Sequence, residues 1–306
     1  MCLYLNQLSY FETEEIHLNQ PQAEIQVDLP LVRQLLLVDY PALANQPLFL
    51  VDEGWDNFIF RIGEHHAVRL PRRAAAVPFL QNEQRCLPKL AERLSLELPL
   101  HVHIGSSGPR FPWTWSIVNW VPGQTSEKHA FPDADVRLLA ETLSILHQPA
   151  EDGAPQNPYR GVPLQSRSQG VEERLHRQRE CTDVDVTRLT DIWHACCETP
   201  PADQMVWIHG DLHPRNVIVR DGALVGLIDW GDVSAGDPAT DLACTWLLLE
   251  TPASRTAFLD IYDAEPCLIQ RALGWALLMG LILLDSGERR HVSLGQATLR
   301  RILADA

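Results

Sequence analysis

One polar segment between short apolar runs, residues 207–237, constrains the fold of this chain more than any other feature. It begins with WIHGDLHPRNVIV and continues, after the turn RDGA, with LVGLIDWGD. Two short apolar runs on either side of an Asp-Gly pair predict a tight β-hairpin. Asn216 and Asp229 are therefore expected close together at the base of that hairpin, with Asp211 five residues before Asn216.

The order of these three residues is that of a phosphoryl-transfer site. A carboxylate such as Asp211 can orient an acceptor hydroxyl and take its proton. The amide oxygen of Asn216 and the carboxylate of Asp229 are hard ligands suited to Mg²⁺ ions that bridge nucleotide phosphates. Protein kinases carry a related His-Arg-Asp-x-x-x-x-Asn and Asp-Phe-Gly pair, where this chain has His-Gly-Asp-x-x-x-x-Asn and Asp-Trp-Gly.

The motifs at 209–216 and 228–242 together resemble those of the aminoglycoside phosphotransferase family, the antibiotic-kinase branch of the protein-kinase-like fold. A weaker resemblance extends over roughly residues 30–300. It implies an α+β, bilobal fold with a small antiparallel β-sheet in the N-lobe and a mostly helical C-lobe, and a chain of 306 residues is also long enough for two cores. The implied parts are an extension of unknown role at 1–27, an N-lobe at 28–118, a hinge at 119–123 and a C-lobe at 124–306.

Two other interpretations of the same residues stay open. The carboxylates and the Asn can be surface-turn and strand-capping residues without a shared function. Alternatively, His209-x-Asp211-x-His213 with Asp229 can ligate Zn²⁺ in a metal hydrolase. That zinc set has no further His or Cys ligands at tight spacing, and it leaves the Pro-Arg-Asn continuation without a role.

The N-terminal part of the chain predicts three strands that would hold a nucleotide. Apolar runs at 47–51, 58–62 and 66–70 are separated by Asp-Glu-Gly-Trp-Asp-Asn and by a short turn. A glycine at such a turn lets backbone N–H groups approach phosphates. The same pattern is found in many members of the family, so Gly54 and Asn57 are expected at the nucleotide.

Arg69 stands where kinases place the Lys that binds nucleotide phosphates. The chain has only two lysines, and neither belongs to this strand. The guanidinium of Arg69 suits phosphate oxygens, with Glu83 of the following helix as its partner. Arg72 and Arg73 compete for the role, but strand alternation favours Arg69. Because Arg and Lys are not interchangeable at a closely fitted site, a nucleotide-binding protein with little or no transfer activity is an alternative.

The resemblance also assigns the hinge and the acceptor side. An aromatic-rich strand at 111–121 ends at Pro-Gly and leads into the hinge, where the backbone of Asn119, Trp120 and Val121 is expected to hydrogen-bond ATP or GTP. Family analogy places the Pro/Gly-rich loop at 149–170 beside the acceptor pocket. The expected acceptor contacts are Asn157, Tyr159, Arg160 and Asp232. The residues expected to support the site structurally are His209 and Asp241, and His147 is also expected to be structural.

Helices are expected over most of the remaining C-terminal part. The expected ranges are 171–180, 184–197, 239–250, 253–263, 266–285 and 292–304. The apolar run at 273–284 is broken by glycines and is interpreted as a buried helix too short to span a bilayer.

Composition limits the kinds of molecule that the protein is expected to bind and the compartment in which it is expected. The formal net charge of −15 disfavours nucleic acid and anionic membranes and is compatible with a cationic substrate. Seven cysteines show neither Cys-x-x-Cys spacing nor a disulfide framework. The first residues lack the basic and apolar regions of a secretory signal, so we expect a cytoplasmic protein that is not bound to a membrane.

These inferences define one expected reaction. The protein is expected to move the γ-phosphate of ATP or GTP, with Mg²⁺ as cofactor, to a hydroxyl of a small molecule. An aminoglycoside-like cationic compound is the first candidate acceptor. Macrolides, choline, homoserine and fructosamines are the alternatives that the resemblance to this fold leaves open.

Overall fold

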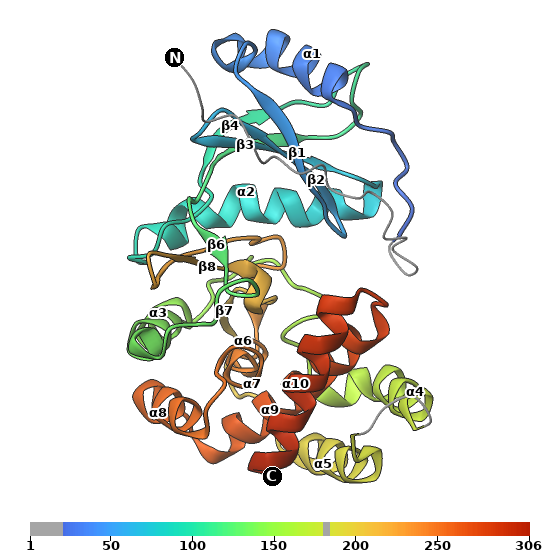
Figure 1. The fold of residues 1–306 in the computed structure, drawn as a ribbon, viewed down its shortest axis with the longest axis vertical. Coiled ribbons are helices and arrows are strands. Elements are labelled where there is room, and N and C mark those ends of the chain that lie inside the picture. Colours follow the sequence, from blue (N-terminus) through green and yellow to red (C-terminus); the bar gives the residue numbers. More distant parts are fainter. Residues whose placement is uncertain (1–20, 180–183) are drawn as a thin grey trace, which may run out of the picture.

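The computed structural model describes residues 21–179 and 184–306. A small antiparallel sheet forms one lobe and most helices form the other, with helix α2 (Val77–Ala91) between them (Figure 1). Two separate clusters of buried apolar side chains fill the two lobes. The protein therefore has the α+β, bilobal fold that the sequence predicts, and each lobe has its own core.

The N-lobe is built on a five-stranded antiparallel sheet with the order β1-β2-β3-β5-β4. Its strands are β1 (Leu48–Glu53), β2 (Asn57–Ile62), β3 (His66–Pro71), β4 (His101–Gly105) and β5 (Trp115–Asn119). Phe58, Phe60 and Ile62 alternate along β2 and all enter the N-lobe core. The pairing of β3 with β2 on one side and with β5 on the other fixes the register of β3, which carries Arg69.

Helix α1 (Leu29–Asp39) packs its buried residues Val32, Leu35 and Leu36 into the N-lobe core. Asp28 accepts a hydrogen bond from the Leu31 N–H at 2.8 Å, so it is the N-cap. The segment before the helix also belongs to the lobe, because Val27 is buried in the same core. The described N-lobe thus starts before residue 28, and the rest of the expected extension, residues 1–20, lies outside the described residues.

The C-lobe is mostly helical and carries two small β-sheets. Its helices are α3 (Val136–Leu146), α4 (Ser168–Gln178), α5 (Val186–Glu198), α6 (Ala239–Leu242), α7 (Cys244–Leu248), α8 (Pro252–Tyr262), α9 (Pro266–Asp285) and α10 (Arg289–Asp305). One sheet contains β6 (Gln124–Thr125), β8 (Val217–Arg220) and β9 (Ala223–Leu227), and the other pairs β7 (Val206–Ile208) with β10 (Ser234–Gly236). Asp221 and Gly222, with φ of 54° and 78°, form the predicted tight turn between β8 and β9.

Helix α9 is the central element of the C-lobe core. Among the described helices, it is the one long and apolar enough to cross a membrane, with a mean hydropathy of 1.9. It is longer than the apolar run that the sequence interpretation considered too short to span a bilayer. However, 72% of that apolar window is buried inside the protein, where α9 packs against α10, α6 and α5. This burial is typical of a core helix.

Four strands and one expected helix differ from the prediction. Strands β4, β6, β7 and β10 were not predicted, and all four lie outside the ranges expected to be helical. Strands β6, β7 and β10 have only two or three residues, which is too short for a period to show in the sequence. The single helix expected at 239–250 is divided into α6 and α7. At the division, Ala243 has φ −54° and ψ −25°, the angles of a tighter 3₁₀ turn.

The close approach of α9 and α10 provides a test of the C-lobe packing. A Cβ atom on Gly295 would lie 2.6 Å from the carbonyl oxygen of Gly280. We expect Gly295→Val to lower the free energy of unfolding by about 1 to 3 kcal/mol, although Val has the higher helix propensity. Denaturant unfolding measures the change. Gly108→Val is the control, because nothing lies within 4 Å of its added Cβ; equal stability of the two variants would contradict the prediction.

Candidate active site

The HGD loop, residues 209–216, is held in place by one buried carboxylate. Asp241 accepts the N–H of His209 at 2.7 Å and the N–H of Gly210 at 2.8 Å, and it is fully buried. His147, at the end of α3, bonds the same carboxylate at 3.1 Å. Burial alone raises the pKa of Asp241, but the hydrogen bond and charge of His147 bring the pKa below its ordinary value. Asp241 thus anchors the backbone of the loop as an ionised acceptor.

His209 uses both ring nitrogens inside the loop. Its Nε2 donates to the carbonyl oxygen of Ile228 at 3.0 Å, and its Nδ1 accepts the N–H of Asp211 at 3.3 Å. Its ring packs 4.6 Å from that of Trp230. His209 is therefore placed as a structural residue without a free nitrogen for a metal. No group of three His, Cys, Asp or Glu side chains in the described residues is arranged to hold a metal ion, which argues against the zinc-hydrolase interpretation.

Asp211 projects from the HGD loop between two basic side chains. Arg160 Nη2 donates to Asp211 Oδ1 at 2.9 Å, and His213 Nε2 lies 3.3 Å from Oδ2. Asn216 Nδ2 donates to the Asp211 carbonyl at 2.8 Å and to Oδ2 at 3.3 Å. Burial raises the pKa of Asp211, but His213 and Arg160 hold it well below its ordinary value. Asp211 is therefore an ionised, accepting group, as required to orient a hydroxyl.

Asn216 and Asp229 lie at the base of the β8–β9 hairpin. The N–H of Ile228 donates to the carbonyl of Asn216 at 2.9 Å, which joins the two strands beside both residues. Asp229 has φ of +63°, a left-handed conformation that is uncommon for residues with a side chain, and its side chain is 53% exposed. Among the described residues, nothing donates to Asn216 Oδ1 or to Asp229 Oδ2. Two such oxygens, completed by phosphates and water, fit Mg²⁺.

Arg69 joins the N-lobe to this site. Its Nη1 donates to both carboxylate oxygens of Glu83 at 2.5 and 2.6 Å, and its Nη2 donates to Asp229 Oδ1 at 2.7 Å. Arg69 and Glu83 are both buried. Burial raises the pKa of Glu83 to about 7, and the charge of Arg69 opposes this rise. The structure thus brings together Arg69, Glu83 and Asp229, which the sequence analysis assigned to phosphate binding and to the metal.

The loop between β1 and β2 uses both backbone groups of Gly54 for hydrogen bonds within the protein. Its N–H donates to the Asn57 carbonyl at 3.0 Å, and its carbonyl accepts from Arg72 at 2.7 Å. Gly54 also lacks a positive φ, so neither its N–H nor an unusual backbone conformation serves a phosphate. The N–H groups of the next two residues, Trp55 and Asp56, have no partner among the described residues. These two groups are therefore the candidates for contact with phosphate.

Arg72 and Arg73, the alternatives to Arg69 for binding phosphate, are both bonded to the loop between β1 and β2. Arg73 bonds the carboxylate of Asp56 at 2.7 Å, and the guanidinium of Arg72 lies 5.2 Å from the ring centre of Phe58. Asn57 is buried, and its Oδ1 has no partner among the described residues. Arg69 is left as the phosphate-binding candidate, as strand alternation predicts.

Only part of the hinge backbone is free to hydrogen-bond a nucleotide. The N–H of Asn119 donates to Leu100 at 2.9 Å, and the N–H of Trp120 donates to His65 at 2.8 Å. These two N–H groups bond backbone carbonyls within the N-lobe, so they are not free to donate to a purine. The N–H of Val121 has no partner among the described residues and remains the candidate donor.

The four residues expected to contact the acceptor differ in their exposure to solvent and in their hydrogen-bond partners. Asn157 is buried, and its Oδ1 accepts the N–H groups of Tyr159 at 2.8 Å and Arg160 at 3.1 Å. Its Nδ2 donates to Asp232 at 2.6 Å. Asn157 therefore shapes the loop instead of facing an acceptor, whereas Tyr159 is 55% exposed. Burial raises the pKa of Asp232 to about 6; Arg160 opposes this rise and Asp211 adds to it.

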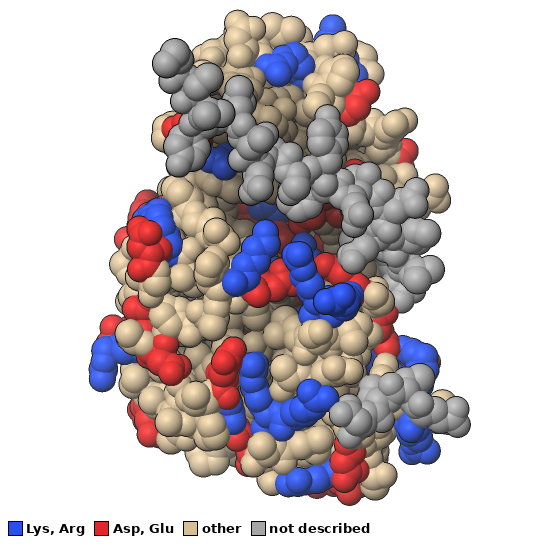
Figure 2. Space-filling model, viewed as in Figure 1, with Lys and Arg blue, Asp and Glu red and all other residues tan. Residues whose placement is uncertain are grey.

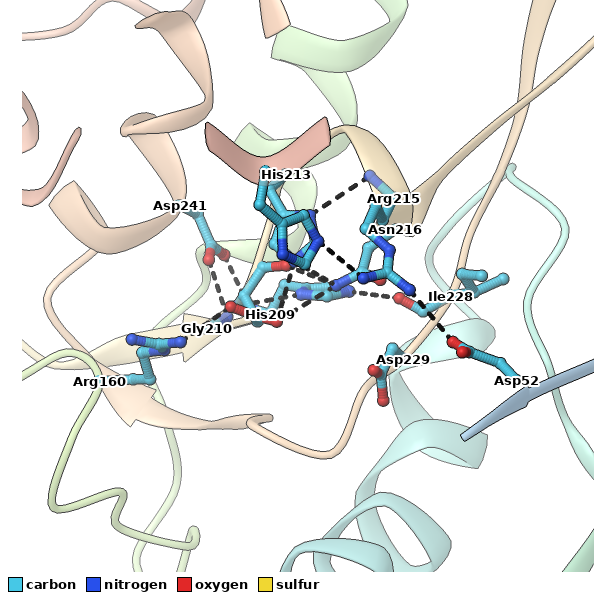
Figure 3. Close-up of polar contacts among 12 residues, drawn as sticks. Asp52, Arg160, His209, Gly210, His213, Arg215, Asn216, Ile228, Asp229 and Asp241 are labelled. Atoms are coloured by element: carbon cyan, nitrogen blue, oxygen red, sulfur yellow. Dashed lines mark hydrogen bonds and ion pairs between the residues drawn. The ribbon is translucent and has the colours of Figure 1, made fainter. Parts of the chain in front are cut away.

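A further contact between the lobes was not predicted from the sequence. Arg215 of the HGD loop donates to Asp52 of β1 at 3.2 Å (Figure 3). It also bonds His291 of α10 at 2.7 Å. Asp52 and Arg215 stand 163 positions apart, so no local pattern relates them. On the face shown in Figure 2, basic side chains gather in front of acidic ones between the lobes. The region is therefore mixed in charge, in contrast to the acidic chain as a whole.

A bilobal fold with an Arg–Glu pair in the small lobe and an Asp–Asn–Asp set in the large lobe defines a protein-kinase-like phosphotransferase. Residues 50–278 match the model of the Phosphotransferase enzyme family. The chain belongs to this family.

Solved structures share the fold over almost their whole length. The GDP complex of wild-type aminoglycoside 2'-phosphotransferase-IIIa has a TM-score of 0.66 and 20% identity, covering 90% of this chain and 98% of that chain. Macrolide 2'-phosphotransferase MphH from Brachybacterium faecium has a TM-score of 0.60 and 20% identity, covering 89% and 97%. The curated relative YcbJ of Bacillus subtilis, an uncharacterized protein, is 29% identical over 121 residues, which span 37% of this chain and 38% of YcbJ.

The raised pKa of Asp232 predicts a pH-dependent contribution to stability. The pKa of Asp232 is about 6 in the folded protein, which is above its value in the unfolded chain. The protonated carboxyl therefore contributes to the stability of the fold below the unfolded pKa, and this contribution is lost as pH rises through the folded pKa. Asp232→Asn avoids this loss and keeps an oxygen that can accept from Asn157. We expect the variant to exceed the wild type in unfolding free energy by roughly 1 kcal/mol near pH 8, with no gain near pH 4.

Denaturant unfolding at the two pH values measures this difference. Asp260→Asn, on the exposed side of α8, is the matched control and should follow the wild type at both. An Asp232→Asn gain that does not change with pH would show that ionisation of this carboxylate is not its cause.

Proposed function

We propose that the protein transfers the γ-phosphate of ATP or GTP, bound with Mg²⁺, to a hydroxyl of a small molecule. The observation that carries the proposal is the convergence of Arg69 and Asp229 with Asp211 and Asn216, from both lobes, on one site. Membership in the phosphotransferase family and the likeness to nucleotide-bound kinase-like folds support it.

In this proposal the nucleotide phosphates meet Arg69 and the free N–H groups of Trp55 and Asp56. Asn216 Oδ1 and Asp229 Oδ2 would hold the metal. Bound Mg²⁺ supplies neutralisation of the charge on the phosphate oxygens. The Val121 N–H is the proposed purine donor, so the base is recognised through the backbone and either purine nucleotide is compatible.

Asp211 is proposed to accept a hydrogen bond from the acceptor hydroxyl and to aim its oxygen at the γ-phosphorus. The bond from that oxygen to phosphorus forms, the bond from phosphorus to the bridging β,γ-oxygen breaks, and the hydroxyl proton passes to Asp211. The phosphorylated acceptor and the nucleoside diphosphate then leave. Because His213 and Arg160 lower the pKa of Asp211, it is a weak base, and its contribution is mainly orientation, with late proton transfer.

The acceptor is proposed to be a small hydroxyl compound of an antibiotic-like class. An aminoglycoside-like cation is the first candidate, supported by the net charge of −15 and by structural neighbours solved with kanamycin and gentamicin. A macrolide-like acceptor is the second candidate, since two fold neighbours are macrolide 2'-phosphotransferases.

The reaction itself is tested with the Asp211→Ala variant. Wild-type protein with Mg²⁺, ATP or GTP and a panel of aminoglycosides, macrolides and amino alcohols should form a phosphorylated product, detected by mass spectrometry. We expect Asp211→Ala to lower the transfer rate about 100- to 10,000-fold with nucleotide binding almost unchanged. Wild-type turnover in the variant would refute the role of Asp211. Nucleotide binding by the wild type without product from any acceptor would favour the silent nucleotide-binding alternative.

The metal site is tested by nucleotide titrations with and without Mg²⁺. Asp229→Ala removes a proposed ligand, so we expect the Mg²⁺-dependent part of nucleotide affinity to fall at least about tenfold, or about 1.4 kcal/mol. Calorimetry measures the affinity, with Asp260→Ala as an exposed-carboxylate control. An unchanged Mg²⁺ dependence in Asp229→Ala would exclude this residue as a ligand.

A further inference from the structure

The Arg160 loop, residues 155–163, is attached to the rest of the C-lobe at both ends. At one end, the N–H of Ala235 in β10 donates to the carbonyl of Pro155 at 2.8 Å. At the other, the N–H of Gly161 donates to the hydroxyl of Thr240 at 3.0 Å. The loop therefore has a defined position, although its sequence is that of an irregular Pro/Gly-rich connection.

Two residues next to Arg160 fix its backbone. Asn157 accepts the N–H of Arg160 and is itself bonded to Asp232. Gly161 has φ of +67°, and a Cβ there would lie 2.6 Å from the Cα of Gly236, so the loop is pressed directly against β10. This support resembles the rigid positioning of a functional group more than the packing of a linker.

The guanidinium of Arg160 is only partly used by the protein. Nη2 donates to Asp211, whereas Nε is buried without a partner among the described residues, and no bond from Nη1 to a described residue exists. Several other arginines also have an unpaired buried Nε. Among the described arginines, however, Arg160 alone contacts the Asp211 carboxylate, which makes its unused donors relevant to the reaction.

The proposed reaction brings the phosphoryl group to the same carboxylate that Arg160 contacts. An acceptor oxygen bound to Asp211 lies about 2.6 to 3.2 Å from the carboxylate and about 3 to 3.5 Å from phosphorus before transfer. Arg160 and the phosphoryl group are thus neighbours around the same carboxylate. Negative charge on the phosphoryl oxygens is what a planar guanidinium binds best.

We infer that Arg160 is a catalytic residue that donates to the transferring phosphoryl group, as an arginine finger supplied by the chain itself. The inference rests on the proposed function and assigns a second role to a residue of the acceptor-side loop. Bonds form and break as in the proposed transfer, and Arg160 remains protonated throughout. Its contribution is electrostatic and is greatest where charge develops in the transition state.

An alternative role for Arg160 is that of a static partner that only keeps Asp211 ionised. A static partner would affect the pH profile of transfer but not the binding of a phosphoryl mimic. A residue that only binds the acceptor would change the acceptor KM and likewise leave the mimic unaffected. Binding of the mimic therefore separates these roles, and it requires no knowledge of the acceptor.

The experiment compares the affinity of the full chain for Mg²⁺-ADP alone with its affinity for Mg²⁺-ADP plus aluminium fluoride, a mimic of the phosphoryl group in flight. We expect the fluoride complex to bind more tightly to the wild type, and Arg160→Ala to lose about 100-fold of that affinity with Mg²⁺-ADP affinity unchanged. Arg160→Lys should recover only part of the loss, because it lacks the planar fork.

Arg167→Ala is the matched control, because Arg167 lies near the same loop, over the ring of Tyr159 at 5.7 Å, and makes no contact with Asp211 in the described chain. It should behave as the wild type. Equal fluoride affinity in Arg160→Ala and wild type, or no gain from fluoride in the wild type, would overturn the inference. Absence of any Mg²⁺-ADP binding by the wild type would instead refute the proposed function. Unchanged Mg²⁺-ADP affinity shows that each variant is folded.

Discussion

The guanidinium of Arg69 is the contact on which the nucleotide site depends, because it bonds Glu83 and Asp229 at the same time. It thereby connects β3, α2 and the C-lobe through one buried group. Removing one partner of a buried pair leaves a charge without compensation, at a cost of about 3 to 5 kcal/mol. The antiparallel pairing of Arg69 with Ile59 and Ser116 on either side fixes its position in the sheet. This arrangement also explains how an Arg can occupy the position of the usual Lys: its planar fork reaches two carboxylates in different directions, whereas an ammonium is a single point charge.

A second buried carboxylate, Asp241, organises the other half of the site. Asp241 of α6 accepts two backbone N–H groups of the HGD loop and so holds the conformation of that loop. His147, which follows α3, bonds the same carboxylate. Asp211 and Asn216 are then oriented by the loop and by each other. Both halves of the site thus rest on buried ionic or hydrogen-bonded groups of the two lobes, as pre-organisation requires.

The part of the site that is local in sequence was predictable from spacing, and the meeting of Arg69 with Asp229, 160 positions apart, was expected only through the resemblance to a known family. Other contacts that depend on tertiary packing were not predicted. A hairpin of fixed length brings Asn216 and Asp229 together, so their spacing predicted their proximity. The contacts of Arg160 with Asp211 and of Arg215 with Asp52 join segments with no common periodicity. For the loop at Gly54, the turn motif gives the residue type, but the loop geometry decides which N–H groups remain free, and these are the N–H groups of Trp55 and Asp56.

Composition alone does not determine which acceptor the site prefers. A net charge of −15 is spread over the molecule, and charges separated by more than about 8 to 10 Å are largely screened at physiological salt. Beside Asp211 lie the guanidinium of Arg160 and the ring of His213, and burial raises the pKa of nearby Asp232 to about 6. A hydroxyl that binds Asp211 must share its oxygens with Arg160. If Arg160 turns to the phosphoryl group, its departure leaves Asp211 Oδ1 to the hydroxyl, and binding of the two substrates becomes coupled through one guanidinium. Acceptor preference would then depend on the pairing around Asp211 more than on the acidity of the protein.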